Sequence, residues 1–153
     1  MEQTKVYSSI PMRTWRWLGV NDARQPEGLP SEQEEQEIHV GKGEKEAVVV
    51  VYREARQGRG QLRAHVEAGG ELKLVKIQLL PADMPHVDAV EVRVEEGARL
   101  HYTAIEAGSA HSATKLLVEL AGDDSIADVA AIYFGDEQRA IDMNYVIRQQ
   151  GRN

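Results

Sequence analysis

The sequence predicts an all-β fold, a right-handed parallel β-helix (β-solenoid) that follows an irregular N-terminal lead-in. A turn built on glycine recurs between apolar segments, with central glycines at Gly41, Gly69, Gly97 and Gly122, which are 28, 28 and 25 residues apart. Near-constant spacing is typical of stacked, equivalent β units. Short apolar segments follow one another from Ile38 onward, and the Asn-Gly and Asp-Gly dipeptides that mark hairpins are absent. A sandwich or jelly roll of hairpins is the alternative architecture.

Composition limits the possible functions. The chain has 153 residues, a formal net charge of −7 and no cysteine. One domain is expected at this length. The negative charge argues against nucleic acid or an anionic membrane as a partner. Without cysteine the chain has no disulfide, no thiolate nucleophile and no Cys-ligated zinc or iron–sulfur site. No apolar run approaches 18 residues and the first residues lack the features of a signal peptide, so a cytoplasmic location is expected.

Residues 1–37 are predicted to be an irregular N-terminal segment. Trp15 and Trp17 form its only aromatic cluster, which either caps the end of the domain or contacts a partner. Ser31 and Glu34 match a capping box, so a short helix is possible there, although the acidic run could equally be extended.

Residues 38–153 are predicted to form the β-helical core, incomplete at its C-terminal end. The valine-rich run 47–52 is typical of a strand buried on both faces or of a solenoid strand. Residues 53–61 form a basic loop that lacks the features of a phosphate-binding P-loop, so we expect a connection between strands. The further predicted strands are 62–66, 72–80, 90–94, 100–107, 116–120, 126–134 and 140–146.

Several tracts of this pattern resemble the core of SufB/SufD proteins, which are components of the SUF iron–sulfur assembly system. They are residues 66–80, 92–100, 117–125, 131–135 and 141–146. The most diagnostic combination is Leu-Ala-Gly-Asp-Asp-Ser at 120–125, followed by Tyr-Phe-Gly at 133–135 and Ile-Asp at 141–142. The resemblance covers roughly residues 11–153.

The resemblance implies a right-handed parallel β-helix and a role in a complex. SufB- and SufD-like proteins pair with each other and with the SufC ATPase, and they form the platform on which clusters are built. The Cys and His residues associated with cluster assembly, and the helical segment that binds the ATPase, lie in later parts of family members. Gln149 and Gln150 occupy the neighbourhood where relatives often carry a His. No functional residue of the family can therefore be transferred to this chain, and no iron–sulfur cluster is expected outside the wider complex.

The sequence offers few candidates for chemistry. The histidines are His39, His65, His86, His101 and His111, and by the glycine alignment they do not fall in one stack. They are interpreted as solvated or packing residues. The alternative is a labile metal contact assisted by a carboxylate such as Glu106.

Two further constellations have little support. Asp123, Asp124 and Asp128 lack the spacing of known calcium loops, so an acidic turn in which Asp caps its own backbone is expected. A triad of Ser109 or Ser112 with His111 and Asp123 lacks a nucleophile elbow. We therefore predict no catalytic residue and no metal ligand in this chain, and the cofactor-binding residues stay unassigned.

The leading functional hypothesis is a non-enzymatic scaffold or partner subunit of cytoplasmic iron–sulfur assembly, acting through its surfaces. Its expected partners are a SufC-like ATPase and a SufB/SufD-like subunit. The alternatives are a small metal-dependent cupin-like enzyme and a purely structural solenoid. Because a solenoid exposes unpaired strand edges at its ends, we also expect self-association through the C-terminal edge.

Overall fold

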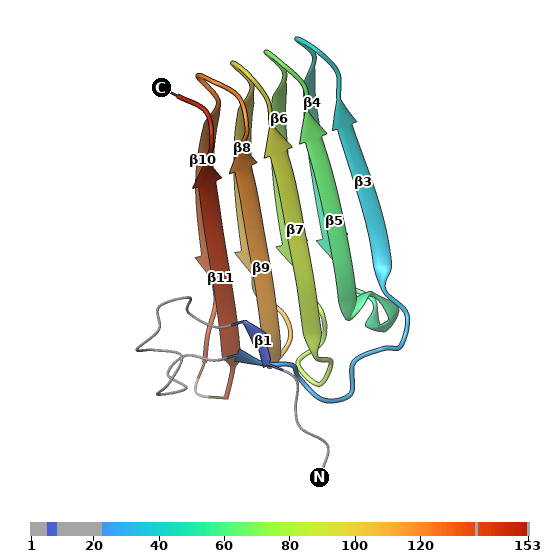
Figure 1. The fold of residues 1–153 in the computed structure, drawn as a ribbon. Helices are drawn as coiled ribbons and strands as arrows, with labels where there is room; N and C mark the ends of the chain where they lie inside the picture. Colours follow the sequence, from blue (N-terminus) through green and yellow to red (C-terminus); the bar gives the residue numbers. More distant parts are fainter. Residues whose placement is uncertain (1–5, 9–22, 137, 153) are drawn as a thin grey trace, which may run out of the picture.

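The protein is a parallel β-solenoid in a computed structural model that describes residues 6–8, 23–136 and 138–152 (Figure 1). Two sheets form its walls, and all neighbouring strands within each wall are parallel. The solenoid predicted from the recurring turns is therefore confirmed. A sandwich of hairpins would require antiparallel neighbours, which these walls do not have.

The strands alternate between the two walls along the chain. The five-stranded sheet has the order β11-β9-β7-β5-β3 and the four-stranded sheet the order β10-β8-β6-β4. The first wall consists of β3 (Glu34–Val40), β5 (Arg59–Val66), β7 (His86–Val94), β9 (His111–Leu120) and β11 (Ala140–Gln149). The second consists of β4 (Lys45–Tyr52), β6 (Glu71–Gln78), β8 (Arg99–Glu106) and β10 (Ile126–Tyr133).

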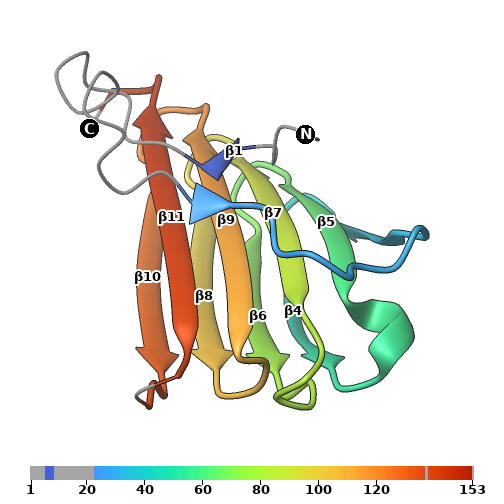
Figure 2. The same ribbon diagram turned by 90° about the horizontal axis from the view of Figure 1, so that it is seen from below.

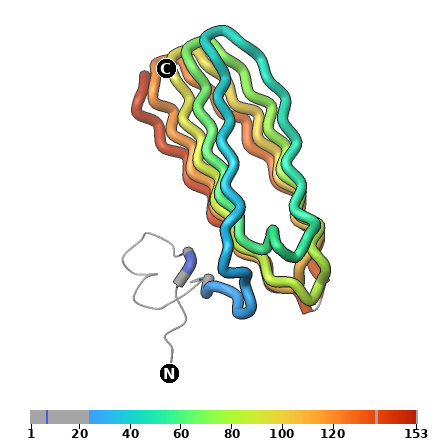
Figure 3. Tube along the Cα trace, turned by 90° about the vertical axis from the view of Figure 1, so that its right-hand side faces the viewer, coloured from blue at the N-terminus to red at the C-terminus, as the bar shows by residue number. Residues whose placement is uncertain are grey.

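One strand from each wall makes one coil of the solenoid, and Figure 3 shows the two walls facing each other along the stack. Coil 1 is β3 and β4, coil 2 is β5 and β6, coil 3 is β7 and β8, and coil 4 is β9 and β10; β11 begins a fifth. The alternating sequence explains this arrangement, because every second side chain points to the shared interior.

The turns between the walls form a stack, but its members differ from those predicted. Gly43, Gly69 and Gly97 have φ of 69°, 68° and 61°, and Asp124 occupies the fourth position with φ 55°. Each of these residues donates its N–H to a carbonyl of the next turn, from Gly43 to Ala68 at 3.1 Å and onward. The predicted alignment was correct at Gly69 and Gly97.

The predicted alignment was wrong at the two outer turns. Gly41 and Gly122 each lie two residues before the position with positive φ, which Gly43 and Asp124 occupy. The true spacings, 43 to 69 to 97 to 124, are 26, 28 and 27 residues. The left-handed conformation, which glycine adopts without cost and Asp tolerates, defines the stack.

Two other connections were left open by the sequence. The predicted connection at 53–61 holds a single 3₁₀ turn, Ala55–Gln57, but it is shorter than predicted, because its last three residues already belong to β5. The capping-box pattern at Ser31 and Glu34 does not begin a helix, because Glu34 is the first residue of β3. Trp15 and Trp17 lie outside the described residues.

The interior is divided into two halves. Near the glycine turns it is aliphatic: Val66, Val94 and Leu120 lie in register on one wall, facing Leu72 and Leu100 on the other, and all are buried. At the opposite end of the strands the buried side chains are polar, and they include Lys76, Gln78, His86, Asp88, Glu106, Ser112 and Thr114. The functional question therefore concerns the polar half.

The N-terminal residues that are described lie on the outside of the five-stranded wall. β1 (Val6–Ser8) pairs antiparallel with β2 (Ala23–Arg24), and the pair lies across this wall, with β1 contacting β9 (Figure 2). Lys115 Nζ lies 4.2 Å from the centre of the Tyr7 ring. In the part of the chain that is described, no helix is long and apolar enough to span a membrane.

Candidate functional site

The polar half of the interior is organised around Lys76. Its ammonium lies 2.7 Å from Asp88 Oδ2 and 2.6 Å from Glu106 Oε1, and it donates a hydrogen bond of 2.7 Å to Thr114 Oγ1. The side chains of Lys76, Asp88 and Glu106 have at most 1% exposure. We call these four residues the Lys76 cluster. It joins coil 2 to coils 3 and 4.

Strand register brings the cluster together. Lys76 follows Leu72 and Leu74 on the inward side of β6, so the alternation of β6 leaves its side chain inside. On the opposite wall Asp88 and Thr114 are register partners, and Gly60 is the partner before them. A Cβ at Gly60 would lie 2.7 Å from the Tyr52 hydroxyl, so glycine at this position leaves room for the tyrosine.

Burial and the neighbouring charges set the ionisation of the cluster. Burial alone would lower the pKa of Lys76, but Asp88, Tyr102 and Glu106 outweigh it and hold that pKa well above its usual value. Burial would raise the pKa of Asp88, yet Lys76 and His86 hold it below the usual range. For Glu106 burial prevails over Lys76 and raises the pKa. The cluster therefore contains a firm ion pair and a second carboxyl that retains its proton more readily.

Further polar and aromatic groups surround the cluster. His86 Nε2 lies 3.6 Å from Asp88 Oδ1, too far for a hydrogen bond, and its ring packs 5.0 Å from that of Tyr52. Gln78 Oε1 accepts a hydrogen bond from the Leu80 N–H at 3.1 Å. Within the described part of the chain, both ring nitrogens of His86, Gln78 Nε2 and Ser112 Oγ have no hydrogen-bond partner. Such buried groups usually bind ordered water.

The chemistry that this arrangement supports is limited. An ammonium held charged by carboxylates is neither a nucleophile nor a base. The cluster is also enclosed, since its charged side chains have almost no exposed surface. It provides a fixed polar link between three coils rather than an accessible reaction centre.

The histidines of the chain do not all lie apart. His39 and His65 are register partners on β3 and β5, with ring centres 5.5 Å apart, so two of the five histidines stack although the five do not form one stack. Each contacts a glutamate, Glu67 at 3.1 Å from His39 and Glu95 at 3.2 Å from His65. The alignment on Gly41 in place of Gly43 concealed this pair.

The remaining histidines are separate from this pair. His101 Nδ1 lies 3.1 Å from Asp128 on the outside of the four-stranded wall, His111 is exposed and His86 is buried beside the Lys76 cluster. Glu106, named as a possible metal-assisting carboxylate, is instead ion-paired with Lys76. Among residues 6–8, 23–136 and 138–152, no three His, Asp or Glu side chains converge as metal ligands do.

The Ser-His-Asp triad considered from the sequence and the acidic turn at Asp123 and Asp124 do not form sites in the structure. Ser109 Oγ donates to the carbonyl oxygen of His111, and Asp123 lies at the far end of β9 from His111. Asp123 Oδ1 accepts from the N–H of Arg152 in the next coil, at 2.7 Å, instead of capping its own turn. Asp128 pairs with His101, so the three aspartates do not surround a common point.

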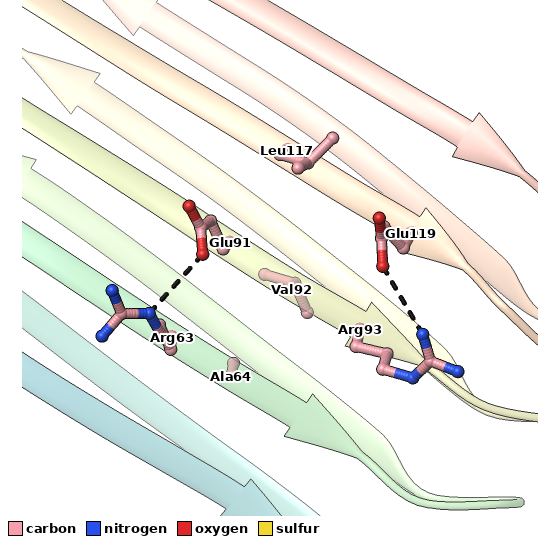
Figure 4. Close-up of a pocket in the computed structure, with 7 residues that line it drawn as sticks. All are labelled: Arg63, Ala64, Glu91, Val92, Arg93, Leu117 and Glu119. Carbon is pink, nitrogen blue, oxygen red and sulfur yellow. Dashed lines mark hydrogen bonds and ion pairs between the residues drawn. The ribbon is translucent and has the colours of Figure 1, made fainter.

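The outer face of the five-stranded wall carries charges in register. A shallow surface pocket of about 280 Å³ lies over β5, β7 and β9 (Figure 4). Arg63 lies 3.5 Å from Glu91, and Arg93 lies 3.5 Å from Glu119; Leu117 is the register partner of Glu91 on β9. These pairs link neighbouring coils, and among the described residues no buried polar side chain without a partner lines the pocket.

Comparison with known proteins identifies the family to which the chain belongs. A family model described as "SUF system FeS cluster assembly, SufBD core domain" matches residues 23–153. The chain belongs to the SufBD core-domain family. The SufBD match covers every coil of the solenoid. It places the protein in SUF iron–sulfur cluster assembly and implies partnership within the SUF complex. No curated protein and no solved structure matches the chain.

Proposed function

We propose that this SufBD-type chain is a non-catalytic scaffold subunit of iron–sulfur cluster assembly, which acts through its surfaces. The observation that carries the proposal is the family match, which spans the whole solenoid. The enclosure of the Lys76 cluster adds support, because a closed interior leaves the walls and ends of the solenoid for contact with partners.

The last coil offers a place for such a partner. Interior positions are exposed here: Tyr133 of β10 is 66% exposed and Ile147 of β11 is 50% exposed. A cavity of about 300 Å³ opens beside Tyr133 and the first residues of β11, and it is lined by Tyr133, Gly135, Arg139, Ile141 and Met143. An apolar layer next to a strand edge suits the addition of another strand. In this proposal a SufB/SufD-like subunit, or a second copy, pairs with this edge.

Co-expression tests the proposal. The chain is produced with a SufC-type ATPase and a SufB/SufD-like subunit, and complex formation and cluster assembly are measured with and without it. We expect a stable complex and more assembled cluster. Ile147→Lys, at the exposed edge, should weaken the complex about tenfold or more, because it places a charge in an apolar contact. The control Leu117→Lys, on the outer face of the five-stranded wall, should not.

Two results would overturn the scaffold role. One is the absence of any complex with either partner, together with unchanged cluster formation. The other is stoichiometric metal in the isolated chain accompanied by turnover of a small substrate, which would support the metal-dependent enzyme instead.

A further inference from the structure

The outer face of the four-stranded wall is apolar, unlike that of the five-stranded wall. Outward side chains of β4, β6, β8 and β10 stand in register as rows across the coils. One row is Val51, Ile77, Ile105 and Ile132, and beside it lie Val49 and Val75. We call these six residues the outer band. Val49 is 62% and Ile132 59% exposed.

No described segment covers the outer band. β1 and β2, the described strands outside the walls, lie across the opposite wall (Figure 2). In Figure 3 the outer side of the four-stranded wall is likewise open. The inward side chains of the same strands already fill the interior, so at the outer band these strands present apolar side chains outward as well. Strands with this composition normally have both faces covered.

A charged margin borders the outer band on the side of the glycine turns. Its first row is Lys45, Glu71, Arg99 and Ile126, in register across the four coils. The row beside it ends in Asp128 at coil 4. The margin therefore carries a lysine at coil 1, a glutamate at coil 2, an arginine at coil 3 and an aspartate at coil 4.

The margin of one copy is complementary in charge to the margin of a second copy placed in the opposite coil order. If two copies pack face to face about a two-fold axis parallel to the strands, coil 1 of one copy lies over coil 4 of the other, and coil 2 lies over coil 3. Glu71, which within its own chain lies 3.0 Å from Lys45 and 3.7 Å from His101, then also faces Arg99 of the second copy. Lys45 comes within reach of Asp128 of that copy. Lys73 faces His101, which already has Asp128 at 3.1 Å. The same rotation places Ile77 over Ile105 and Val51 over Ile132.

The other in-plane axis gives no such match. Rotation about the direction in which the coils stack would keep each coil over itself, so Glu71 of one copy would meet Leu79 of the other, and Ile126 would meet Phe134. Leu79 is apolar and 49% exposed. Burying Glu71 against it would leave that charge without a partner from the second copy, which is costly. The pattern thus selects one arrangement of the dimer.

We propose that a second copy of this chain covers the outer band, in a face-to-face dimer whose two-fold axis runs parallel to the strands. Sheets packed in this way lie about 10 Å apart, with interdigitated side chains. Four strands spaced by about 4.8 Å and some seven residues of about 3.3 Å give roughly 400–500 Å² per copy. This is below the roughly 800 Å² per partner of a standard interface. The dimer is therefore weak, with dissociation in the micromolar range.

This contact is separate from the strand-edge contact of the proposed function. One uses the outer face of the four-stranded wall and the other uses the β10 and β11 end, so variants of one leave the other intact. Either proposal can therefore fail alone.

Sedimentation velocity of the full chain from about 5 to about 200 µM tests the dimer. We expect a concentration-dependent shift from monomer to dimer. Ile105→Lys should raise the dissociation constant at least about tenfold, because it buries a charge against Ile77 of the partner copy. Leu117→Lys is the matched control, a leucine of similar partial exposure on the outside of the opposite wall, and should change it less than about twofold.

Charge reversal tests the axis. Glu71→Arg alone and Arg99→Glu alone should each weaken the dimer about tenfold, because each places like charges opposite one another. The double variant should return the dissociation constant to within about threefold of the wild-type value. A monomer throughout the concentration range, or equal effects of Ile105→Lys and Leu117→Lys, would overturn the dimer. A double variant no better than the single ones would overturn the two-fold arrangement.

Discussion

At the scale of single residues, Lys76 is the most constrained side chain of the interior. Three oxygen atoms lie within 2.7 Å of its ammonium, and its side chain has no exposed surface. Burying these charges is unfavourable in itself, and the pairing offsets that cost. Removing one partner leaves the others buried without compensation, so the cluster should be sensitive to single substitutions.

Lys76→Met should therefore destabilise the protein strongly. It keeps most of the side-chain volume but leaves Asp88 and Glu106 without their cation, which typically costs about 3–5 kcal/mol. The measurement is the free energy of unfolding in urea at neutral pH. Lys73→Met is the matched control on the same strand, with 63% of its side chain exposed, and should cost less than about 1 kcal/mol. Equal losses in the two variants would contradict the role assigned to the cluster.

The two carboxyl groups of the cluster should affect pH dependence in opposite directions. Because the pKa of Glu106 is raised in the folded protein, its contribution to stability is present at low pH and is lost as the pH rises through the raised pKa. The pKa of Asp88 is lowered, so its contribution is present above the ordinary carboxyl pKa and is lost as the pH falls.

Glu106→Gln and Asp88→Asn should separate these contributions. Relative to wild type, Glu106→Gln should gain stability between about pH 4 and pH 8, by about 1.4 kcal/mol per unit of pKa shift. Asp88→Asn should be less stable than wild type above about pH 4, since it removes a carboxylate that pairs with Lys76, and this deficit should shrink as the pH falls below that value. Unfolding free energies measured from about pH 2 to about pH 8 check both signs, and parallel curves for the two variants would refute the assignment.

At the scale of elements, the glycine turns set the spacing of the coils. Gly97 has φ of 61°, and a Cβ there would meet no described atom within 4 Å. Any cost of substitution at this position is therefore conformational and not due to a clash. Asp124 shows that a residue with a short polar side chain can adopt the same conformation in the same stack.

Gly97→Val should thus cost about 1–3 kcal/mol of unfolding free energy, and Gly97→Asn less than about 1 kcal/mol, because Asn tolerates positive φ. Gly135→Val is the control: a Cβ there likewise meets no described atom within 4 Å, and Gly135 is not among the glycines with positive φ. Thermal or urea unfolding distinguishes the three variants. If Gly97→Val and Gly135→Val cost the same, the backbone conformation would not be the cause.

The elements also show which features of the fold could be predicted from the sequence. Alternation and recurring glycine were sufficient to predict the solenoid and most of its strands, but the first half of β3 was assigned to the irregular N-terminal segment. They could not show whether Gly41 or Gly43 has the positive φ, because the spacing of glycines does not specify backbone dihedral angles. The resulting offset hid the stacking of His39 with His65. The alternation of residues 72–78 did contain a signal for the site, because Lys76 follows Leu72 and Leu74 on the inward face. The residues that pair with Lys76 depend on strand register, which the sequence does not show.

At the scale of the whole molecule, the two walls have different outer surfaces. Charge pairs such as Arg63 with Glu91 connect the coils of the five-stranded wall, whereas the outer band makes the four-stranded wall apolar. The valine-rich sequence of 47–52 predicts a strand buried on both faces or a solenoid strand. The structure shows the second, and the proposed dimer would also satisfy the first. Membership in the SufBD family was recognisable from sequence tracts, whereas the difference between the walls depends on which strands share a wall.

The stacking of each coil on its two neighbours also determines how the protein unfolds. Each strand of a wall pairs only with the strands of the coils before and after it, so the molecule behaves as a one-dimensional array of units coupled to nearest neighbours. In such an array the terminal units open most readily, and opening spreads inward. The Lys76 cluster fastens coil 2 to coils 3 and 4 and so joins these units into one cooperative block. Coil 1 and β11, which lie outside that block, are the places where the array can lengthen, shorten or exchange partners without disturbing its centre.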